Sequence, residues 1–222
     1  MLILAADTSG RNGSLALVEF HSGSARTVEL VGIEGGTFSA QLIPQIAALL
    51  RTHHLTKSDI GGFAVVSGPG SFTGLRVGLA AIKGLAEILR RPIAAVSRLE
   101  ATALLAGAQG SILVALDASR GQVYVATYSR ENGQAVALTE QLLSRDEFRA
   151  RVQGWYLVTC DQSLAQEFTS AVLVESPRAD VIARLGFDKM QRGEIVSPES
   201  LDVTYLRASD AERKTPACGA GS

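Results

Sequence analysis

The pattern most suggestive of chemistry is the glycine-rich segment 67–74, Ser-Gly-Pro-Gly-Ser-Phe-Thr-Gly, which follows a short apolar run. Gly68 and Gly70 permit positive φ and close backbone approach, while Pro69 stiffens the loop. Ser71 or Thr73 can cap a following helix, whose free N–H groups form an anion site. The segment is not a P-loop, because no Gly-Lys-Ser/Thr sequence follows it. Two interpretations stay open, namely a cradle for phosphate and a purely structural strand-to-helix turn.

Two shorter turns could also face a phosphate. Asp7-Thr8-Ser9 follows the apolar run 2–6, and Asp117-Ala118-Ser119 follows the run 112–116. Short hydroxyl side chains and exposed N–H groups suit an anion, and an aspartate can hold a metal-bound water. The same residue types are also ordinary turn residues. The aspartates lie 110 residues apart (117 minus 7), close to half of the 222-residue chain. An internal duplication is the economical interpretation.

Metal and nucleophile chemistry finds little support in the sequence. The three histidines are His21, His53 and His54, and none neighbours a credible nucleophile turn. Adjacent residues on a helix point about 100° apart, so His53 and His54 rarely share an ion. We therefore expect no catalytic residue and no metal-ligating residue.

Apolar periodicity predicts the elements that position these turns. In the first half it predicts strands over 2–6, 14–20, 27–33, 63–66 and 93–96, with helices over 38–50, 73–90 and 97–106. This order is β-β-β-α-β-α-β-α. The second half repeats it in reduced form, with strands over 112–116, 122–128, 135–139 and 155–159 and helices near 145–152 and 179–191. We predict two lobes, 1–107 and 108–207, and a flexible tail, 208–222.

One face of the helix predicted over 73–90 carries small residues. Gly74, Gly78, Ala81 and Leu85 recur at steps of four, three and four, so they share that face. A flat face allows another helix to approach closely, either within the domain or from a partner. A specific interface needs about 800 Å² from each partner.

Composition limits the classes of partner and compartment. The chain has 21 basic and 22 acidic residues, a net charge of −1, which gives no electrostatic footprint for holding nucleic acid unaided. Its two cysteines stand outside any C-x-x-C spacing and suit a reducing compartment. The N-terminal segment 1–7 lacks a basic region and predicts a strand rather than a signal peptide. No apolar run approaches the roughly 20 residues that span a bilayer, so we expect a cytoplasmic protein.

Four blocks together resemble the bacterial TsaB (YeaZ) family. They are Asp7-Thr8-Ser9, the segment 67–78, the segment 116–124 and the late Tyr205-Leu206-Arg207, and the match runs over about residues 1–207. The resemblance implies an actin-like, sugar-kinase-like ASKHA fold of two related lobes, the first ribonuclease H-like and the second reduced. It also implies a non-catalytic paralogue of TsaD in tRNA threonylcarbamoyladenosine (t6A) biosynthesis.

The resemblance further implies a function. The chain would be a scaffold or activator that works with TsaD and TsaE. Their reaction transfers threonylcarbamoyl from threonylcarbamoyl-AMP to N6 of adenosine 37, in tRNAs that read codons starting with adenine. TsaD-type catalysts carry a His-x-x-x-His metal pair, and the equivalent positions here hold Phe38 and Leu42. The alternative is an autonomous ASKHA-type ATP-binding phosphotransferase or a metallopeptidase, both of which need ligands that this sequence lacks.

Partners and site residues follow from the same resemblance. We expect docking on TsaD through the first-lobe helices, self-association on that surface when TsaD is absent, contact with tRNA mainly through the complex, and no membrane partner. No cofactor is expected on the chain alone, and ATP or ADP is expected at the interface with TsaD. The expected interface residues are Phe38, Leu42, Ile46, Gly74, Gly78, Ala81 and Leu85. The expected vestigial phosphate or nucleotide loops are Asp7, Thr8, Ser9, Gly68, Pro69, Gly70, Ser71, Asp117 and Ser119.

Overall fold

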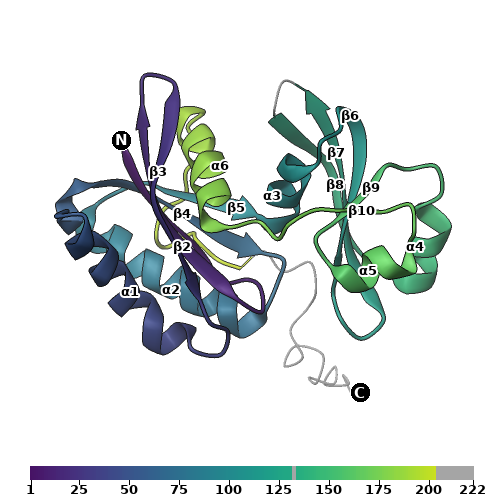
Figure 1. The fold of residues 1–222 in the computed structure, drawn as a ribbon, viewed down its shortest axis with the longest axis horizontal. Helices are drawn as coiled ribbons and strands as arrows, with labels where there is room; N and C mark the ends of the chain where they lie inside the picture. Colours follow the sequence, from purple (N-terminus) through teal and green to yellow (C-terminus); the bar gives the residue numbers. More distant parts are fainter. Residues whose placement is uncertain (132–133, 204–222) are drawn as a thin grey trace, which may run out of the picture.

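The structure of the chain is a computed structural model that describes residues 1–131 and 134–203. Two lobes lie side by side, each built on a five-stranded mixed sheet (Figure 1). The tail predicted over 208–222 and the motif at 205–207 lie outside the described residues.

The first sheet has the strand order β3-β2-β1-β4-β5. β2 is antiparallel to both β1 and β3, whereas β4 and β5 run parallel to β1. Its strands are β1 (Leu2–Asp7), β2 (Gly13–His21), β3 (Ser24–Ile33), β4 (Ile60–Gly68) and β5 (Ile93–Ser97). The helices between and after them are α1 (Phe38–Thr52), the short 3₁₀ turn η1 (Lys57–Asp59), α2 (Phe72–Leu89) and α3 (Arg98–Leu105).

The second sheet repeats this topology. Its order is β10-β9-β6-β7-β8. From the opposite edge this is β8-β7-β6-β9-β10, so each strand corresponds to the first-sheet strand numbered five lower. The strands are β6 (Gly110–Asp117), β7 (Gln122–Glu131), β8 (Gln134–Ser144), β9 (Leu157–Thr159) and β10 (Val172–Leu173). The helices are α4 (Arg145–Arg151), α5 (Gln162–Glu167) and α6 (Ala179–Gln191). Both the predicted ASKHA fold class and its two related lobes are confirmed.

The last helix of each repeat packs on the sheet of the other repeat. α6 lies across β1, β2, β4 and β5 of the first sheet, on the face opposite α1 and α2 (Figure 1). α3 places Leu99 and Ala103 against Ile112 and Tyr128 of the second sheet. The division at residue 107 stays a prediction for the domains. In space, α1, α2 and α6 cover the first sheet and α4 and α5 pack on the second, while α3 lies between the lobes, with Ala101 in the core of the first and Leu99 in that of the second.

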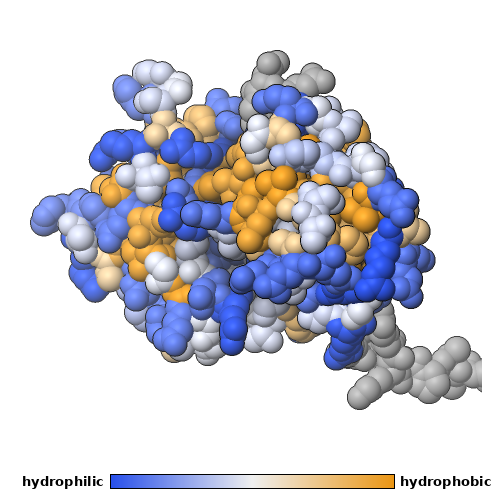
Figure 2. Space-filling model, turned by 45° about the vertical axis from the view of Figure 1, so that its right-hand side comes forward, coloured by the Kyte–Doolittle hydropathy of each residue, from blue (hydrophilic) through white to orange (hydrophobic). Residues whose placement is uncertain are grey.

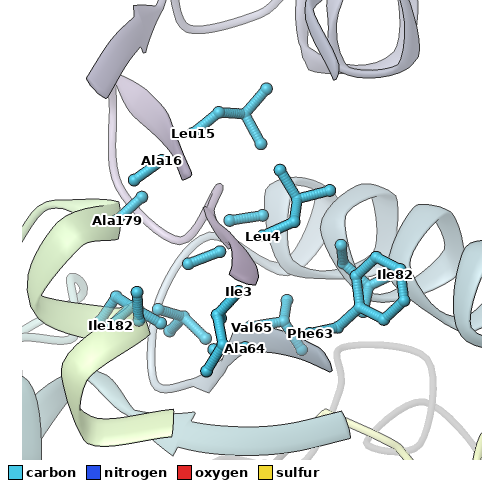
Figure 3. Close-up of a cluster of buried hydrophobic side chains, with 14 of the residues drawn as sticks. Ile3, Leu4, Leu15, Ala16, Phe63, Ala64, Val65, Ile82, Ala179 and Ile182 are labelled. Atoms are coloured by element: carbon cyan, nitrogen blue, oxygen red, sulfur yellow. The ribbon is translucent and has the colours of Figure 1, made fainter. Parts of the chain in front are cut away.

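The core of the first lobe lies on both faces of its sheet. Figure 3 shows Ile3 of β1 lying toward Ile182 of α6, while Leu4 lies on the side of Ile82 of α2. Successive strand residues point to opposite faces, so a strand buried on both sides reads as a continuous apolar run. This explains why the sequence showed runs rather than alternation at 2–6 and 63–66.

Short elements escaped the sequence prediction. α5 spans six residues and β10 only two, too few to show a recurring apolar period. Strand β8 runs from Gln134 to Ser144, longer than the predicted 135–139, and its additional residues 140–144 pair with the first half of β7. The other predicted strands and helices are present, with ends shifted by a few residues.

Apolar residues also reach the surface. Figure 2 shows them gathered in patches with hydrophilic residues between and around them. The most exposed large apolar side chains are Met1, Ile43, Phe72, Ile88, Val136, Leu138, Tyr156, Leu173 and Ile195. Within residues 1–131 and 134–203, no helix is both long and apolar enough to cross a membrane.

Gly186 provides a test of the packing of α6 on the first sheet. A Cβ atom at Gly186 would lie 2.4 Å from Cβ of Ala64 in β4. We expect Gly186→Ala to lower the free energy of unfolding by about 1–2 kcal/mol, because the overlap outweighs the gain of about 1 kcal/mol in helix propensity. Thermal and urea unfolding measure the change. The control is Gly84→Ala in α2, where a Cβ meets nothing within 4 Å, and this variant should be more stable than the wild type. Equal stabilisation by both changes would contradict the close approach of α6.

Candidate functional site

The predicted loops of the two lobes face one another across a cleft. Asp7, Gly68 and Asp117 end β1, β4 and β6, and the carboxyl ends of such strands are where ligands bind in α/β folds. The cleft has a volume of about 730 Å³. Of the predicted loop residues, it is lined by Ser9, Gly70, Ser71, Asp117 and Ser119. Asp7 and Thr8 lie buried behind this surface.

The glycine-rich turn is locked to the Asp7-Thr8-Ser9 turn. Ser71 N–H donates to the carbonyl oxygen of Ser9 at 2.7 Å, and the Thr8 hydroxyl donates to the carbonyl oxygen of Gly74 at 2.7 Å. A Cβ at Gly74 would lie 2.0 Å from the carbonyl oxygen of Thr8, and one at Gly78 would lie 2.3 Å from its hydroxyl. These glycines therefore allow α2 to touch the end of β1.

The start of α2 has the geometry that the sequence predicted. Gly68 has φ 139°, in the region that favours glycine, and the Gly68–Pro69 peptide is cis. Ser71 is the N-cap, and its hydroxyl accepts a hydrogen bond from Gly74 N–H at 3.3 Å. A Cβ at Gly70 would lie 2.4 Å from the carbonyl oxygen of Ser9. The turn thus has a defined structural role.

Asp7 is a buried carboxylate that supports Ser9. Its Oδ1 accepts hydrogen bonds from Ser9 N–H at 2.8 Å and from the Ser9 hydroxyl at 2.6 Å. Burial raises the pKa of Asp7 above its usual value near 3.8, and the bonds from Ser9 and the positive charge of Arg98 act in the opposite direction. With only 4% of its surface exposed, Asp7 shapes the loop rather than facing a ligand.

Asp117, the counterpart of Asp7 in the second repeat, is engaged differently. Arg145 Nη2 lies 2.9 Å from Asp117 Oδ1, and the same guanidinium also pairs with Glu167. The Asp117 N–H donates to Asp161 Oδ2 at 2.6 Å. The following turn holds Ser119 and Arg120 at positive φ. The second loop is therefore a charge-paired turn, and its carboxylate already has a cation.

Several cleft residues were not singled out from the sequence. Arg11, Arg98, Cys160, Asp161 and Ser176 line the cleft together with the predicted loops. Arg98 and Asp161 could have been found from the sequence. Arg98 directly follows β5, and Asp161 lies two residues after β9, at the ends of buried parallel strands where ligands bind in α/β folds. Ser176 lies in the connection between β10 and α6, and no sequence pattern places this connection at the cleft.

Most of the predicted interface residues lie inside the chain. Phe38, Leu42 and Ile46 of α1 belong to the core of the first lobe, and Gly74 and Gly78 contact Thr8. The small-residue stripe therefore serves packing within the chain, one of the two alternatives the sequence left open. Ala81 and Leu85 are half-buried and keep part of their surface. Among the described residues, no three of His, Cys, Asp and Glu are grouped to hold a metal ion.

Comparisons with known proteins agree in both sequence and structure. Residues 35–152 match the family model described as TsaD: tRNA N6-adenosine threonylcarbamoyltransferase. The chain is 31% identical to the tRNA threonylcarbamoyladenosine biosynthesis protein TsaB of Bacillus subtilis (strain 168), covering 96% of this chain and 97% of that protein. The protein of the same description from Escherichia coli (strain K12) is also 31% identical, covering 97% and 99%. The solved structure described as YeaZ from Pseudomonas aeruginosa superimposes with a TM-score of 0.76 at 27% identity, covering 92% and 99%.

Two lobes of repeated topology with a cleft at the strand ends define a protein of the ASKHA class. Within that class, identity over almost the full length of the Bacillus and Escherichia proteins decides the family. The chain belongs to the TsaB (YeaZ) family, and the resemblance drawn from its motifs is confirmed.

The charge on Asp7 provides a pH-dependent test of this site. Because its folded pKa is raised, the native state binds more protons than the unfolded chain above about pH 4, so stability falls as pH rises through this interval. Asp7→Asn keeps a carbonyl oxygen for Ser9 but cannot ionise. We expect the variant to unfold at the same or a higher temperature than the wild type at pH 7. This advantage should shrink toward pH 4. Each unit by which the pKa of Asp7 in the folded state exceeds its pKa in the unfolded state corresponds to about 1.4 kcal/mol of stability.

Thermal unfolding of both proteins between pH 4 and pH 7 measures this difference. A variant that loses stability at pH 7 but not at pH 4 would show that the ionised carboxylate stabilises the turn, contrary to our expectation. Asp146→Asn, at an exposed position on α4 where the carboxylate pairs with Arg149, is the comparison and should gain no stability over the wild type as the pH rises.

Proposed function

We propose that this chain is a non-catalytic scaffold or activator in t6A biosynthesis. In this role it works with TsaD and TsaE. The reaction that they support transfers threonylcarbamoyl from threonylcarbamoyl-AMP to N6 of adenosine 37, in tRNAs that read codons starting with adenine. The observation that carries the proposal is the 31% identity to proteins named for tRNA threonylcarbamoyladenosine biosynthesis, over almost their whole length.

Residues of both lobes support an accessory rather than a catalytic role. At the two positions where a TsaD-type enzyme needs metal-binding histidines, Phe38 and Leu42 are buried apolar residues. The Asp7 carboxylate accepts a hydrogen bond from the Ser9 hydroxyl, and the Asp117 carboxylate forms an ion pair with Arg145. A hydrolytic or phosphotransfer site needs a free carboxylate or a metal ligand at such positions, so an autonomous phosphotransferase or metallopeptidase is not favoured.

The outer surface of α1 and α2 is the docking surface that we propose for TsaD. On α2, the residues Thr73, Val77, Ala80, Gly84 and Ile88 recur at steps of four, three, four and four and share the face directed away from the sheet. Ile88 is 73% exposed, and no described residue lies within 4 Å of a Cβ built at Gly84. The expected interface is thus displaced around the helix from Gly74 and Gly78, with Ala81 and Leu85 at its border.

Aromatic and apolar side chains flank this surface. Phe72, at the start of α2, is 40% exposed, and the Arg76 guanidinium lies 3.8 Å from the centroid of its ring. On α1, Ile43 is 49% exposed. Aromatic and arginine residues are enriched among the side chains that dominate interface energies. We propose that the same surface supports self-association into a homodimer when TsaD is absent.

The remaining assignments follow from this role. With a net charge of −1 the chain should meet tRNA mainly through the complex, whose other members supply positive surface. We propose that ATP or ADP binds at the interface with TsaD rather than serving as a cofactor of this chain, and that the protein acts in the cytoplasm.

Gly84→Arg tests the docking surface without disturbing the fold. Space is open around Gly84, and arginine is the better helix former, so the variant should fold at least as stably as the wild type. We expect its Kd for TsaD to rise at least about tenfold, because a long charged side chain would be buried in the interface. Calorimetric titration with purified TsaD measures this change.

The matched control is Gly107→Arg, which makes the same chemical change at an exposed position after α3 with nothing within 4 Å. It should bind TsaD as the wild type does. Equal affinity of both variants would remove the outer face of α2 from the interface. Gly78→Arg is unsuitable as a probe, because its side chain would collide with Thr8 inside the chain.

Reconstitution tests the function itself. TsaD, TsaE, threonylcarbamoyl-AMP and unmodified tRNA are incubated with and without this chain, and t6A is quantified by mass spectrometry. We expect the t6A yield to be at least about tenfold higher with the chain than without it. The yield with Gly84→Arg should be lower than the yield with Gly107→Arg. Equal product with and without the chain would reject the proposed function.

A further inference from the structure

Arg98 lines the cleft between the two lobes. It is the first residue of α3, directly after β5, and its Nη2 lies 3.5 Å from the Ser176 hydroxyl and 3.8 Å from Cys160 Sγ. Both neighbours come from the second repeat. Arg98 therefore reaches across the cleft from the end of the first sheet.

The charge of Arg98 is not neutralised by a carboxylate within ion-pair distance in the described part of the chain. Within residues 1–131 and 134–203, its buried Nε has no hydrogen-bond partner, and its Nη2 has two long contacts to neutral groups. An arginine side chain has five N–H donors in a fixed planar arrangement. A half-buried guanidinium with so few acceptors would be stabilised by an anion bound beside it.

The acidic residues of the cleft do not supply that anion. Asp7 influences Arg98 through charge alone, and its Oδ1 is taken by the two hydrogen bonds from Ser9. Asp117 is paired with Arg145, and Asp161 accepts the Asp117 N–H. The Arg98 side chain thus shares the cavity with the hydroxyl groups of Ser71, Ser119 and Ser176, whereas the Ser9 hydroxyl already donates to Asp7.

We propose that this cleft binds a phosphate group directly on Arg98, without a metal ion. Guanidinium groups match the oxygens of phosphate in a two-point contact, and serine hydroxyls donate to the remaining oxygens. Mg²⁺ would require carboxylate or phosphate oxygens in octahedral array beside an unpaired positive charge, which disfavours it. The inference goes beyond the proposed function and does not depend on it, because it concerns the chain alone.

Inorganic phosphate is the probe for this site. Purified full-length chain is titrated calorimetrically in a phosphate-free buffer at constant ionic strength, with EDTA and separately with Mg²⁺. We expect binding in EDTA that Mg²⁺ does not strengthen, and a loss of affinity of at least about tenfold in Arg98→Gln. Arg98→Lys should fall between them, because it keeps the charge but loses the two-point contact.

Arg151→Gln is the matched control, since Arg151 is exposed on α4 and bonds to Gln141 outside the cleft. It should bind phosphate as the wild type does. An Arg98→Gln variant that unfolds more easily but keeps the wild-type Kd would make Arg98 only a bridge between the lobes and overturn the proposal. Absence of phosphate binding by the wild type would overturn it as well.

Two further measurements distinguish the source of the phosphate and do not rely on a variant. ADP should bind no more tightly than phosphate, with or without Mg²⁺. Tighter binding of ADP that requires Mg²⁺ would assign the cleft to a metal nucleotide instead and reject our proposal. In NMR titration of the isotopically labelled wild type, phosphate should shift the signals of Arg98 Nε–H and of the Ser9 and Ser119 amides, and shifts confined to other residues would contradict the site.

Discussion

The close approach of α2 to the end of β1 is the contact on which the rest of the structure depends. Gly74 and Gly78 place the helix against Thr8, and the Thr8 hydroxyl and the Ser71 N–H join the two segments by hydrogen bonds. Any side chain at either glycine would push the helix away from the sheet. This contact fixes the wall of the cleft on one side of α2 and determines which face of the helix remains outside.

The two faces of α2 have therefore acquired different roles. The inner face combines glycines with the buried Leu75, Leu79 and Ile82, and it completes the core of the first lobe. The outer face keeps small residues and the exposed Ile88, and among the described residues nothing lies within 4 Å of a Cβ built at Gly84. A helix whose small residues continue around to its free side can accept a second protein at short range, which is the physical basis of the docking surface that we propose.

The two lobes share one sheet topology, but the loops that they contribute to the cleft differ. The exchange of α3 and α6 between the sheets holds the lobes together, and Lys189 of α6 pairs with Glu100 of α3 at 3.1 Å where the helices meet. The two related aspartates no longer do the same work. Asp7 is buried and organises a turn, whereas Asp117 is exposed enough to pair with Arg145. The cleft between the two aspartate loops is thus lined by the cation Arg98 as well.

The sequence alone determined the local and repeated features. Buried strands are visible as apolar runs, helices as a period of 3.6, the duplication as a second Asp-x-Ser turn, and the start of α2 as a glycine-rich turn with a serine cap. Only the tertiary structure decided which sheet α3 and α6 cover, which face of α2 lies inside, and that Arg98 meets Ser176 and Arg145 meets Asp117. These features depend on contacts between residues far apart in the chain, and such contacts leave no periodic pattern in a single sequence.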